Sequence, residues 1–153
     1  MGGLLAVVIM KKKELEILLS RLKPHPNPKP KLEQYTIPSK LASTILNLAY
    51  LSNDIAGKVV FDFGCGTGLL AIGAALLGAR YVLGLDIDKE AIRIAKENAK
   101  LAQSLAKKRL RLGFVVCDVK NWCGECDTVI QNPPFGIQSL HADRPFLAKA
   151  LEC

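Results

Sequence analysis

The stretch Lys58–Gly68, KVVFDFGCGTG, decides the fold because it joins a buried strand to a glycine-rich turn. Its apolar and aromatic first half predicts a strand over Val59–Phe63. Its second half carries three glycines with the spacing GxGxG, which permits a tight turn and a close approach of a ligand to the backbone. The small-residue segment that follows predicts a helix from about Leu69 to Leu77. This order of strand, turn and helix begins a parallel βαβ unit.

The alternation of strand and helix continues along the chain. Three more strands are predicted from RYVLGLDID (80–88), RLGFVVCDV (111–119) and DTVIQ (127–131). Helices are predicted from KEAIRIAKENAKLAQSLAKK (89–108) and DRPFLAKALEC (143–153). Strands joined by crossover helices form a parallel sheet, and the near-continuous apolar strands predict burial on both faces. The predicted fold class is α/β, with a doubly wound, mostly parallel, Rossmann-like sheet.

The chain ahead of this region divides into two further segments. Residues 1–10 are apolar but too short to span a membrane, and the lysines follow the apolar run instead of preceding it as in a signal peptide. We interpret them as an extension or alternative start. Residues 11–31 combine an amphipathic helix (11–22) with a proline- and lysine-rich arm, KPHPNPKPK, whose backbone is extended. His25 and the arm lysines are suited to lie along a phosphate backbone, and a plain surface linker is the alternative.

The α/β domain itself is assigned to residues 32–153. It begins with a helix that Ser39 is expected to cap and that continues to Leu51. With 153 residues, 50% of them hydrophobic, the chain is long enough for one domain with a core. The formal net charge of +7 favours anionic partners, nucleic acid above all, and nothing in the sequence indicates a membrane protein.

Cysteine usage bears on the compartment and on metals. Five cysteines without framework spacing indicate reduced thiols, and we therefore expect an intracellular, cytoplasmic protein. Cys123 and Cys126 form a CxxC with Cys117 nearby, which leaves structural zinc as an alternative. Because no second pair with metal-ligand spacing follows, we favour incidental thiols and no metal.

All the unusual residues of the α/β region fall where predicted strands end. They are Gly64 to Gly68 after the first strand, Asp86 to Asp88 after the second, Cys117 and Asp118 after the third, and Asn132 to Phe135 after the fourth. Because the carboxyl ends of parallel strands meet at one edge of a sheet, these residues predict one ligand site.

The acids at these ends have distinct expected roles. Asp86 suits hydrogen bonds from ribose hydroxyls, with helix capping as the alternative. Asp88 is expected to cap the helix that follows it. Asp118 suits the exocyclic amine of a cofactor base, and the alternative is a solvated turn acid.

The corner NPPF after the fourth strand is suited to hold a planar amine. The side-chain carbonyl of Asn132 and the backbone carbonyl of Pro133 offer two acceptors for the two hydrogens of an NH₂ group. The ring of Phe135 offers a flat face, on which a base stacks with about 1–3 kcal/mol. With a sulfonium methyl as the electrophile, the first step needs positioning and no general base. The corner does not separate adenine N6 from guanine N2 or a glutamine amide.

DFGCGTG, DID and NPPF together resemble class I S-adenosylmethionine-dependent methyltransferases of the amino-methylating branch. With LEQYTIPSKLA and HADRPFLAKALE added, the sequence resembles the archaeal and eukaryotic methyltransferase-like-five group over roughly residues 11–153. That group methylates N6 of an adenosine in small-subunit ribosomal RNA. The resemblance implies S-adenosylmethionine as the cofactor, RNA met by the basic arm, and a small zinc-binding activator subunit that adds along a sheet edge.

The resemblance also implies roles for individual residues. Those expected to hold the target base are Asn132, Pro133, Pro134 and Phe135. Three groups of residues are expected to bind the cofactor. Over it would close Gln34, Tyr35 and Thr36, and its methionine pocket would be shaped by Asp62, Gly64, Gly66 and Gly68. Its nucleoside would be held by Asp86 at the ribose, Ile87 against adenine, and Asp118 and Val119 at the adenine edge.

One departure from the family pattern concerns the end of the chain. The family fold has seven strands in the order 3-2-1-4-5-7-6, whereas Cys153 falls in the helix after the fourth strand. We therefore expect an incomplete sheet with the fourth strand at an open edge. A module that binds cofactor or RNA without turnover is the alternative to an active enzyme.

Overall fold

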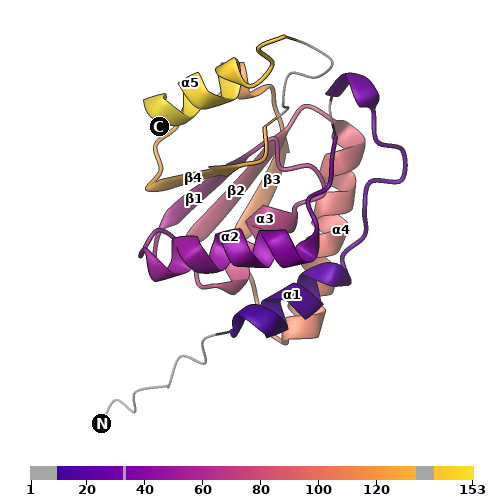
Figure 1. The fold of residues 1–153 in the computed structure, drawn as a ribbon, viewed down its shortest axis with the longest axis vertical. Coiled ribbons are helices and arrows are strands. Elements are labelled where there is room, and N and C mark those ends of the chain that lie inside the picture. The colour runs from indigo at the N-terminus through magenta and orange to yellow at the C-terminus, as the bar shows by residue number, and fades with distance from the viewer. Residues whose placement is uncertain (1–9, 33, 134–139) are drawn as a thin grey trace.

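The computed structural model describes residues 10–32, 34–133 and 140–153. Its sheet consists of β1 (Val59–Phe63), β2 (Tyr81–Asp86), β3 (Leu112–Val116) and β4 (Thr128–Gln131). The strands lie in the order β3-β2-β1-β4, and every neighbouring pair is parallel (Figure 1). The predicted α/β class and the predicted order of the first four strands are confirmed.

Helices lie on both faces of this sheet (Figure 1). The larger group on one face consists of α1 (Lys12–Ser20), α2 (Ser39–Leu51), α3 (Leu69–Leu76) and α4 (Lys89–Ala106). On the other face, α5 (Arg144–Glu152) packs with the short 3₁₀ turn η2 (Val119–Asn121). A second 3₁₀ turn, η1 (Pro30–Leu32), lies in the segment between α1 and α2, and from here on residues 23–32 and 34–37 of that segment are called the arm.

The central strand β1 contributes to the core on both faces. Val60 packs in the cluster beneath α1 to α4, whereas Phe61 and Phe63 pack in the cluster with α5. Successive side chains of a strand point to opposite faces, so a strand covered on both sides is apolar at nearly every position. Asp62 is the exception, and it is buried on the face that carries α3.

The N-terminal helix α1 shares the main core. Leu15, Leu18 and Leu19 are buried, and α1 contacts α2 and α3. Gly73 permits the close packing of α3 against α2, because a Cβ at that position would collide with the side chain of Leu46 in α2.

Two expectations from the sequence are wrong in detail. Ser39 does not cap α2: the cap position is Pro38, whose extended backbone (φ −60°, ψ 144°) makes Ser39 the first helical residue. The strand β3 is not buried on both faces, since Val115 and Val116 are 37% and 41% exposed. The reason is the strand order, which places β3 at the edge of the sheet.

None of the helices in the described ranges is long and apolar enough to cross a membrane.

Candidate functional site

The glycine turn after β1 is built from left-handed backbone. Gly66 and Gly68 have φ values of 54° and 90°, which residues with a Cβ adopt only at an energetic cost. The Gly66 N–H donates to Asp86 Oδ2 at 2.8 Å, which ties the turn to the end of β2. A Cβ on Gly66 would meet no protein atom within 4 Å, so the backbone at this position faces open space.

Asp62 fixes the helix that leaves this turn. Its Oδ2 accepts from the backbone N–H of Ala71 at 3.0 Å, in the first turn of α3. Burial raises the pKa of this carboxyl well above its ordinary value; the Ala71 hydrogen bond lowers it by less, and the nearby Asp86 raises it further. Asp62 therefore organises the strand–turn–helix junction while it also lines the cavity described below.

Asp86 sits where the second strand ends and connects two backbone segments. Its Oδ2 accepts from Gly66, and its Oδ1 accepts from the backbone N–H of Asp88 at 2.9 Å. Burial raises its pKa, and these two hydrogen bonds lower it by less. Each carboxylate oxygen can accept a second hydrogen bond, so both retain capacity for ligand hydroxyls.

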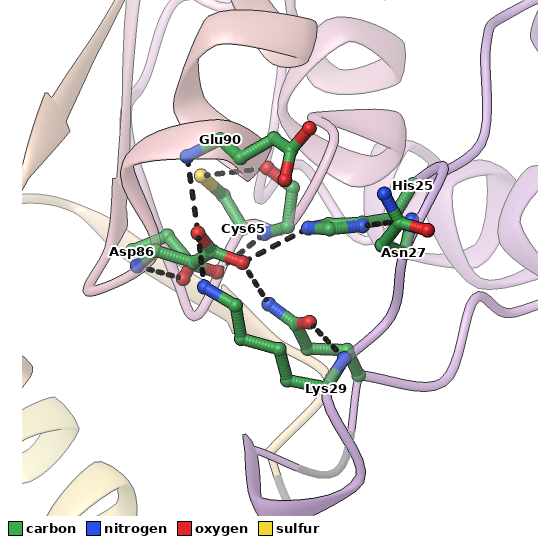
Figure 2. Close-up of polar contacts among 9 residues, drawn as sticks. His25, Asn27, Lys29, Cys65, Asp86 and Glu90 are labelled. Atoms are coloured by element: carbon green, nitrogen blue, oxygen red, sulfur yellow. Dashed lines mark hydrogen bonds and ion pairs between the residues drawn. The ribbon is translucent and has the colours of Figure 1, made fainter.

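Asp88 caps α4 as predicted, with its Oδ1 accepting from the Glu90 N–H at 3.0 Å. The same carboxylate also binds the arm, through His25 and other side chains on both sides of η1 (Figure 2). The side chain of His25 is only 5% exposed. The suggestion that His25 lies along a phosphate backbone is therefore wrong, because its ring is enclosed between the arm and α4.

At the third strand end, Asp118 serves as a turn acid and also faces the cavity. Its Oδ1 accepts from the Lys120 N–H at 3.0 Å and caps η2. Val119, next in the chain, is buried in the core cluster beneath α5. The backbone N–H of Cys117 donates to Asp86 O, so the ends of β2 and β3 are held together.

At the fourth strand end, Asn132 reaches across to the arm. Its side-chain nitrogen donates to the backbone carbonyl of Tyr35 at 3.2 Å. This contact uses one of the two hydrogens on the side-chain nitrogen, and the side-chain carbonyl is a further acceptor. Pro133 follows it, and the predicted base-holding residues Pro134 and Phe135 fall outside the described ranges.

These strand ends and the arm enclose one cavity of about 500 Å³. The predicted cofactor residues that line it are Gln34, Tyr35, Thr36, Asp62, Gly64, Gly66, Asp86, Ile87, Asp118 and Val119. Asn132 lines it as well. Gly68 and Pro133, although described, do not line the cavity. The sequence-based grouping of four strand ends around one site thus matches their placement in space.

The cavity wall also contains residues that the sequence did not single out. Phe146 of α5 lines it and lies against Gly64, with its ring 2.9 Å from the position of a Cβ there. Cys65 lines it with a nearly buried thiol, and burial raises its pKa, as do the neighbouring Asp62 and Asp86. Lys31 and Lys120 add positive charge to the lining. The one sequence signal that could have pointed to Phe146 as a residue of the cavity wall was that it is an aromatic residue in the predicted last helix.

The cysteine pair considered for zinc gives no metal cluster. Among the residues that the structure describes, no group of three or more His, Cys, Asp or Glu side chains is arranged to hold a metal ion. All five cysteines are free, and Cys123 is exposed whereas Cys126 is half-buried.

Comparison with known proteins gives a family model that matches part of the chain and relatives that match nearly all of it. The family model described as Ribosomal protein L11 methyltransferase (PrmA) matches residues 42–132, which run from α2 to the end of β4. An uncharacterized protein of Methanocaldococcus jannaschii is 51% identical over 94% of this chain and 68% of its own length. The rRNA N(6)-adenosine-methyltransferase METTL5 of Danio rerio is 37% identical over 93% of this chain and 69% of its own length.

A solved structure extends the similarity to three dimensions. The crystal structure of a protein of Pyrococcus horikoshii, titled as an RNA methyltransferase candidate, is 50% identical and superposes with a TM-score of 0.83. The match covers 92% of this chain and 68% of that one. The chain thus spans about two thirds of the length of these relatives.

Proposed function

Because the chain belongs to the class I S-adenosylmethionine-dependent methyltransferases of the METTL5 group, we propose that it methylates N6 of an adenosine in small-subunit ribosomal RNA. The observation that carries transfer to a planar amine is the position of Asn132, and the adenine target is supported by the similarity to the METTL5 relative. Asn132 lies at the end of β4 and lines the same cavity as Asp86 at the end of β2. An amine held by Asn132 would therefore face a cofactor bound along the other strand ends.

The residues of the cavity fit S-adenosylmethionine. Its volume of about 500 Å³ lies within the usual range for small-molecule sites, roughly 300–1,000 Å³. The open space beside Gly66 admits a ligand against the backbone, and the Asp86 carboxylate is positioned for hydroxyl groups. Ile87, half exposed and on the cavity wall, offers an apolar surface to a flat ring.

The chemistry asked of the protein is mostly positioning. Bound S-adenosylmethionine supplies an electrophilic methyl group on a sulfonium sulfur. The carbonyl of Asn132 would accept one hydrogen of the adenine amine, and the Pro133 carbonyl would accept the other. Both contacts would direct the nitrogen lone pair toward the methyl group, and holding reacting atoms in line accelerates such a transfer. The sulfur would leave with the electron pair of the broken S–C bond as neutral S-adenosylhomocysteine, and the methylated nitrogen would lose one proton to water.

The net charge of the whole chain supports a polyanionic substrate. It is formally +7, and Lys31 and Lys120 lie at a cavity whose wall also carries Asp86 and Asp118. Lysines near a phosphate backbone raise affinity through release of bound counterions. We further propose a cytoplasmic location, with which free cysteines are compatible.

A protein partner is also proposed, a small zinc-binding activator that adds along a sheet edge. The outer edge of β3 supports this, because β3 pairs only with β2 among the described strands and carries the exposed Val115 and Val116. Strand addition uses the unpaired backbone groups of such an edge. Copurification with a partner from cells, and its loss on changing Val115 to lysine, test this point.

The main test uses labelled S-adenosylmethionine with separated small- and large-subunit ribosomal RNA, followed by digestion to nucleosides. We expect label in N6-methyladenosine from small-subunit RNA. An Asn132→Ala variant should lose transfer. Because it also removes the hydrogen bond to the Tyr35 carbonyl in the cavity wall, its Kd for S-adenosylhomocysteine is measured alongside, and transfer should be lost even with the cofactor at saturation. Label in guanosine, or in protein alone, would refute the adenine target. Label only in the large-subunit RNA would refute the subunit assignment, and cofactor binding without any transfer would indicate a binding module.

A further inference from the structure

The carboxylate of Asp88 is the meeting point of three side chains from the arm (residues 23–32 and 34–37). His25 Nε2 and Gln34 Nε2 both approach its Oδ2, at 2.9 and 2.7 Å. Lys29 Nζ approaches its Oδ1 at 3.2 Å, next to the capping hydrogen bond from Glu90. A carboxylate has about four acceptor positions, so the arm and the cap together fill them.

The arm contacts are specific in their donor and acceptor roles. The backbone N–H of Asn27 donates to His25 Nδ1 at 3.0 Å, which assigns the ring proton to Nε2 and directs it at Asp88 (Figure 2). The backbone N–H of Lys29 donates to the side-chain oxygen of Gln34. The amide of Gln34 is thus used on both sides within the protein, its oxygen by the arm and its nitrogen by Asp88.

Asp88 is buried and lies outside the cavity lining. Its side chain is 2% exposed, and it is absent from the cavity wall, whereas His25, Gln34, Tyr35 and Thr36 of the arm all line that wall. The hydrogen bonds from Gln34, His25, Glu90 and Lys29 together outweigh burial, which alone would raise the pKa, and they hold the Asp88 pKa well below its ordinary value. The carboxylate is therefore ionised when it holds the arm.

We propose that Asp88 is a positioning residue that holds the arm as one wall of the cofactor site, through His25, Lys29 and Gln34, and so sets the affinity for S-adenosylmethionine. The inference rests on the cofactor cavity of the proposed function and is independent of the RNA target. Gln34 both lines the cavity and links the arm to Asp88 at the start of α4, and Tyr35 and Thr36 continue the same wall.

Asp88→Asn isolates this role from helix capping. Asparagine caps helices about as well as aspartate, so α4 retains its N-terminal hydrogen bond. The side-chain NH₂, however, faces the donors His25 Nε2 and Gln34 Nε2, and two donors cannot pair. Lys29→Met is a second variant, on a side chain that is 54% exposed and outside the cavity wall, and it removes one anchor without a change in the core.

Glu97→Gln is the matched control. Glu97 also lies on α4 and pairs with the arm, since Lys23 Nζ is 3.2 Å from its Oε2, but this pair is exposed and not part of the cavity. The substitution removes the same unit of negative charge as Asp88→Asn. We expect it to behave as the wild type.

Two measurements report on the arm and on the cofactor. Trypsin cannot cut readily before proline, so Lys31–Leu32 is the one susceptible bond in the segment 23–37, where Lys23 and Lys29 precede prolines. We expect faster cleavage there in Asp88→Asn and, to a smaller degree, in Lys29→Met. If the arm is in place about one tenth of the time in Asp88→Asn, the Kd for S-adenosylhomocysteine rises about tenfold.

A double variant separates positioning from general weakening. Asp88→Asn and His25→Ala remove the same contact. The fold-rise in Kd of the double variant should therefore be smaller than the product of the two single fold-rises, whereas two independent effects would give that product. Unchanged cleavage in Asp88→Asn, faster cleavage with an unchanged Kd, or equal effects of Glu97→Gln would each overturn the proposal. So would failure of the wild-type chain to bind S-adenosylhomocysteine, whereas loss of adenosine labelling with binding intact bears only on the RNA target.

Discussion

Replacing Gly66 by alanine tests whether the glycine turn is the floor of the cofactor site. The backbone at Gly66 has φ 54°, and a Cβ placed there meets no protein atom within 4 Å. The added methyl group therefore strains the backbone without a clash inside the protein. Because Gly66 lines the cavity, the open space that the methyl group enters is the space assigned to the ligand.

The expected loss of stability is small. Left-handed backbone costs a residue with a Cβ about 1–2 kcal/mol, and alanine restricts the unfolded chain enough to recover about 0.4–1 kcal/mol. The net loss is about 1 kcal/mol, which lowers Tm by roughly 2–4 °C in a chain of this length. Overlap with the cofactor adds at least a tenfold rise in Kd, equivalent to about 1.4 kcal/mol.

Gly57→Ala is the matched control for this substitution. Gly57 also has positive φ, 73°, and open space around its Cβ position, but it lies in the loop before β1 and outside the cavity wall. Differential scanning calorimetry should give similar Tm losses for both variants. Titration with S-adenosylhomocysteine should show weak binding for Gly66→Ala and wild-type binding for Gly57→Ala. Equal Kd values would refute the assignment of the turn to the cofactor site.

Three further predictions concern packing and pH. Gly84→Ala places a Cβ 2.6 Å from the ring of Phe114, so we expect a loss of about 1–3 kcal/mol in urea unfolding, partly restored by adding Phe114→Leu. No loss in the single variant would contradict the packing reasoning. Leu46→Ala, at a fully buried site, should cost about 2–5 kcal/mol in the same assay, whereas Leu48→Ala, 60% exposed, should stay within about 0.5 kcal/mol; similar values for the two would argue against the assigned core. For Asp62 the folded pKa is raised by burial, so its contribution to stability is complete below the ordinary pKa of about 3.9 and is lost as pH rises through the folded value. Asp62→Asn should make the unfolding free energy fall less steeply with rising pH. A steeper fall would show that the Asp62 pKa is lowered on folding and not raised.

The sequence predicts those strands correctly whose apolar pattern matches their burial in the sheet. The strand β1 has the predicted bounds, Val59–Phe63, because burial on both faces demands an apolar residue at nearly every position. The strand β3 has a similar pattern but half-exposed valines, Val115 and Val116. An apolar run by itself carries no signal that its strand lies at an edge, and the edge position of β3 was indicated only by the strand order of the family that the sequence resembles.

The candidate site divides in the same way. The strand ends around Asp86 and Asn132 were predictable because parallel strands place their carboxyl ends together. The contact of His25 with Asp88 spans 63 positions and was not predictable, since the proline-rich pattern sets the extended geometry of the arm and not its partner. The position of Phe146 in the cavity wall depends on how α5 packs, which a single amphipathic pattern does not determine.

The strand order has a consequence for synthesis on the ribosome. Val60 pairs with Val82 in β2 and with Thr128 in β4, so one side of β1 finds its partner much later in the chain than the other. From the end of β2 at Asp86 to the end of β4 at Gln131, translation takes roughly 2–9 s at about 5–20 residues per second. During that interval the nascent chain exposes the edge of β1 that later pairs with β4, and stalled chains should show it as rapid amide exchange along that side of β1. The glycine turn and Asp86 therefore leave the ribosome before Asn132, and the half of the pocket assigned to the cofactor is made before the half assigned to the base.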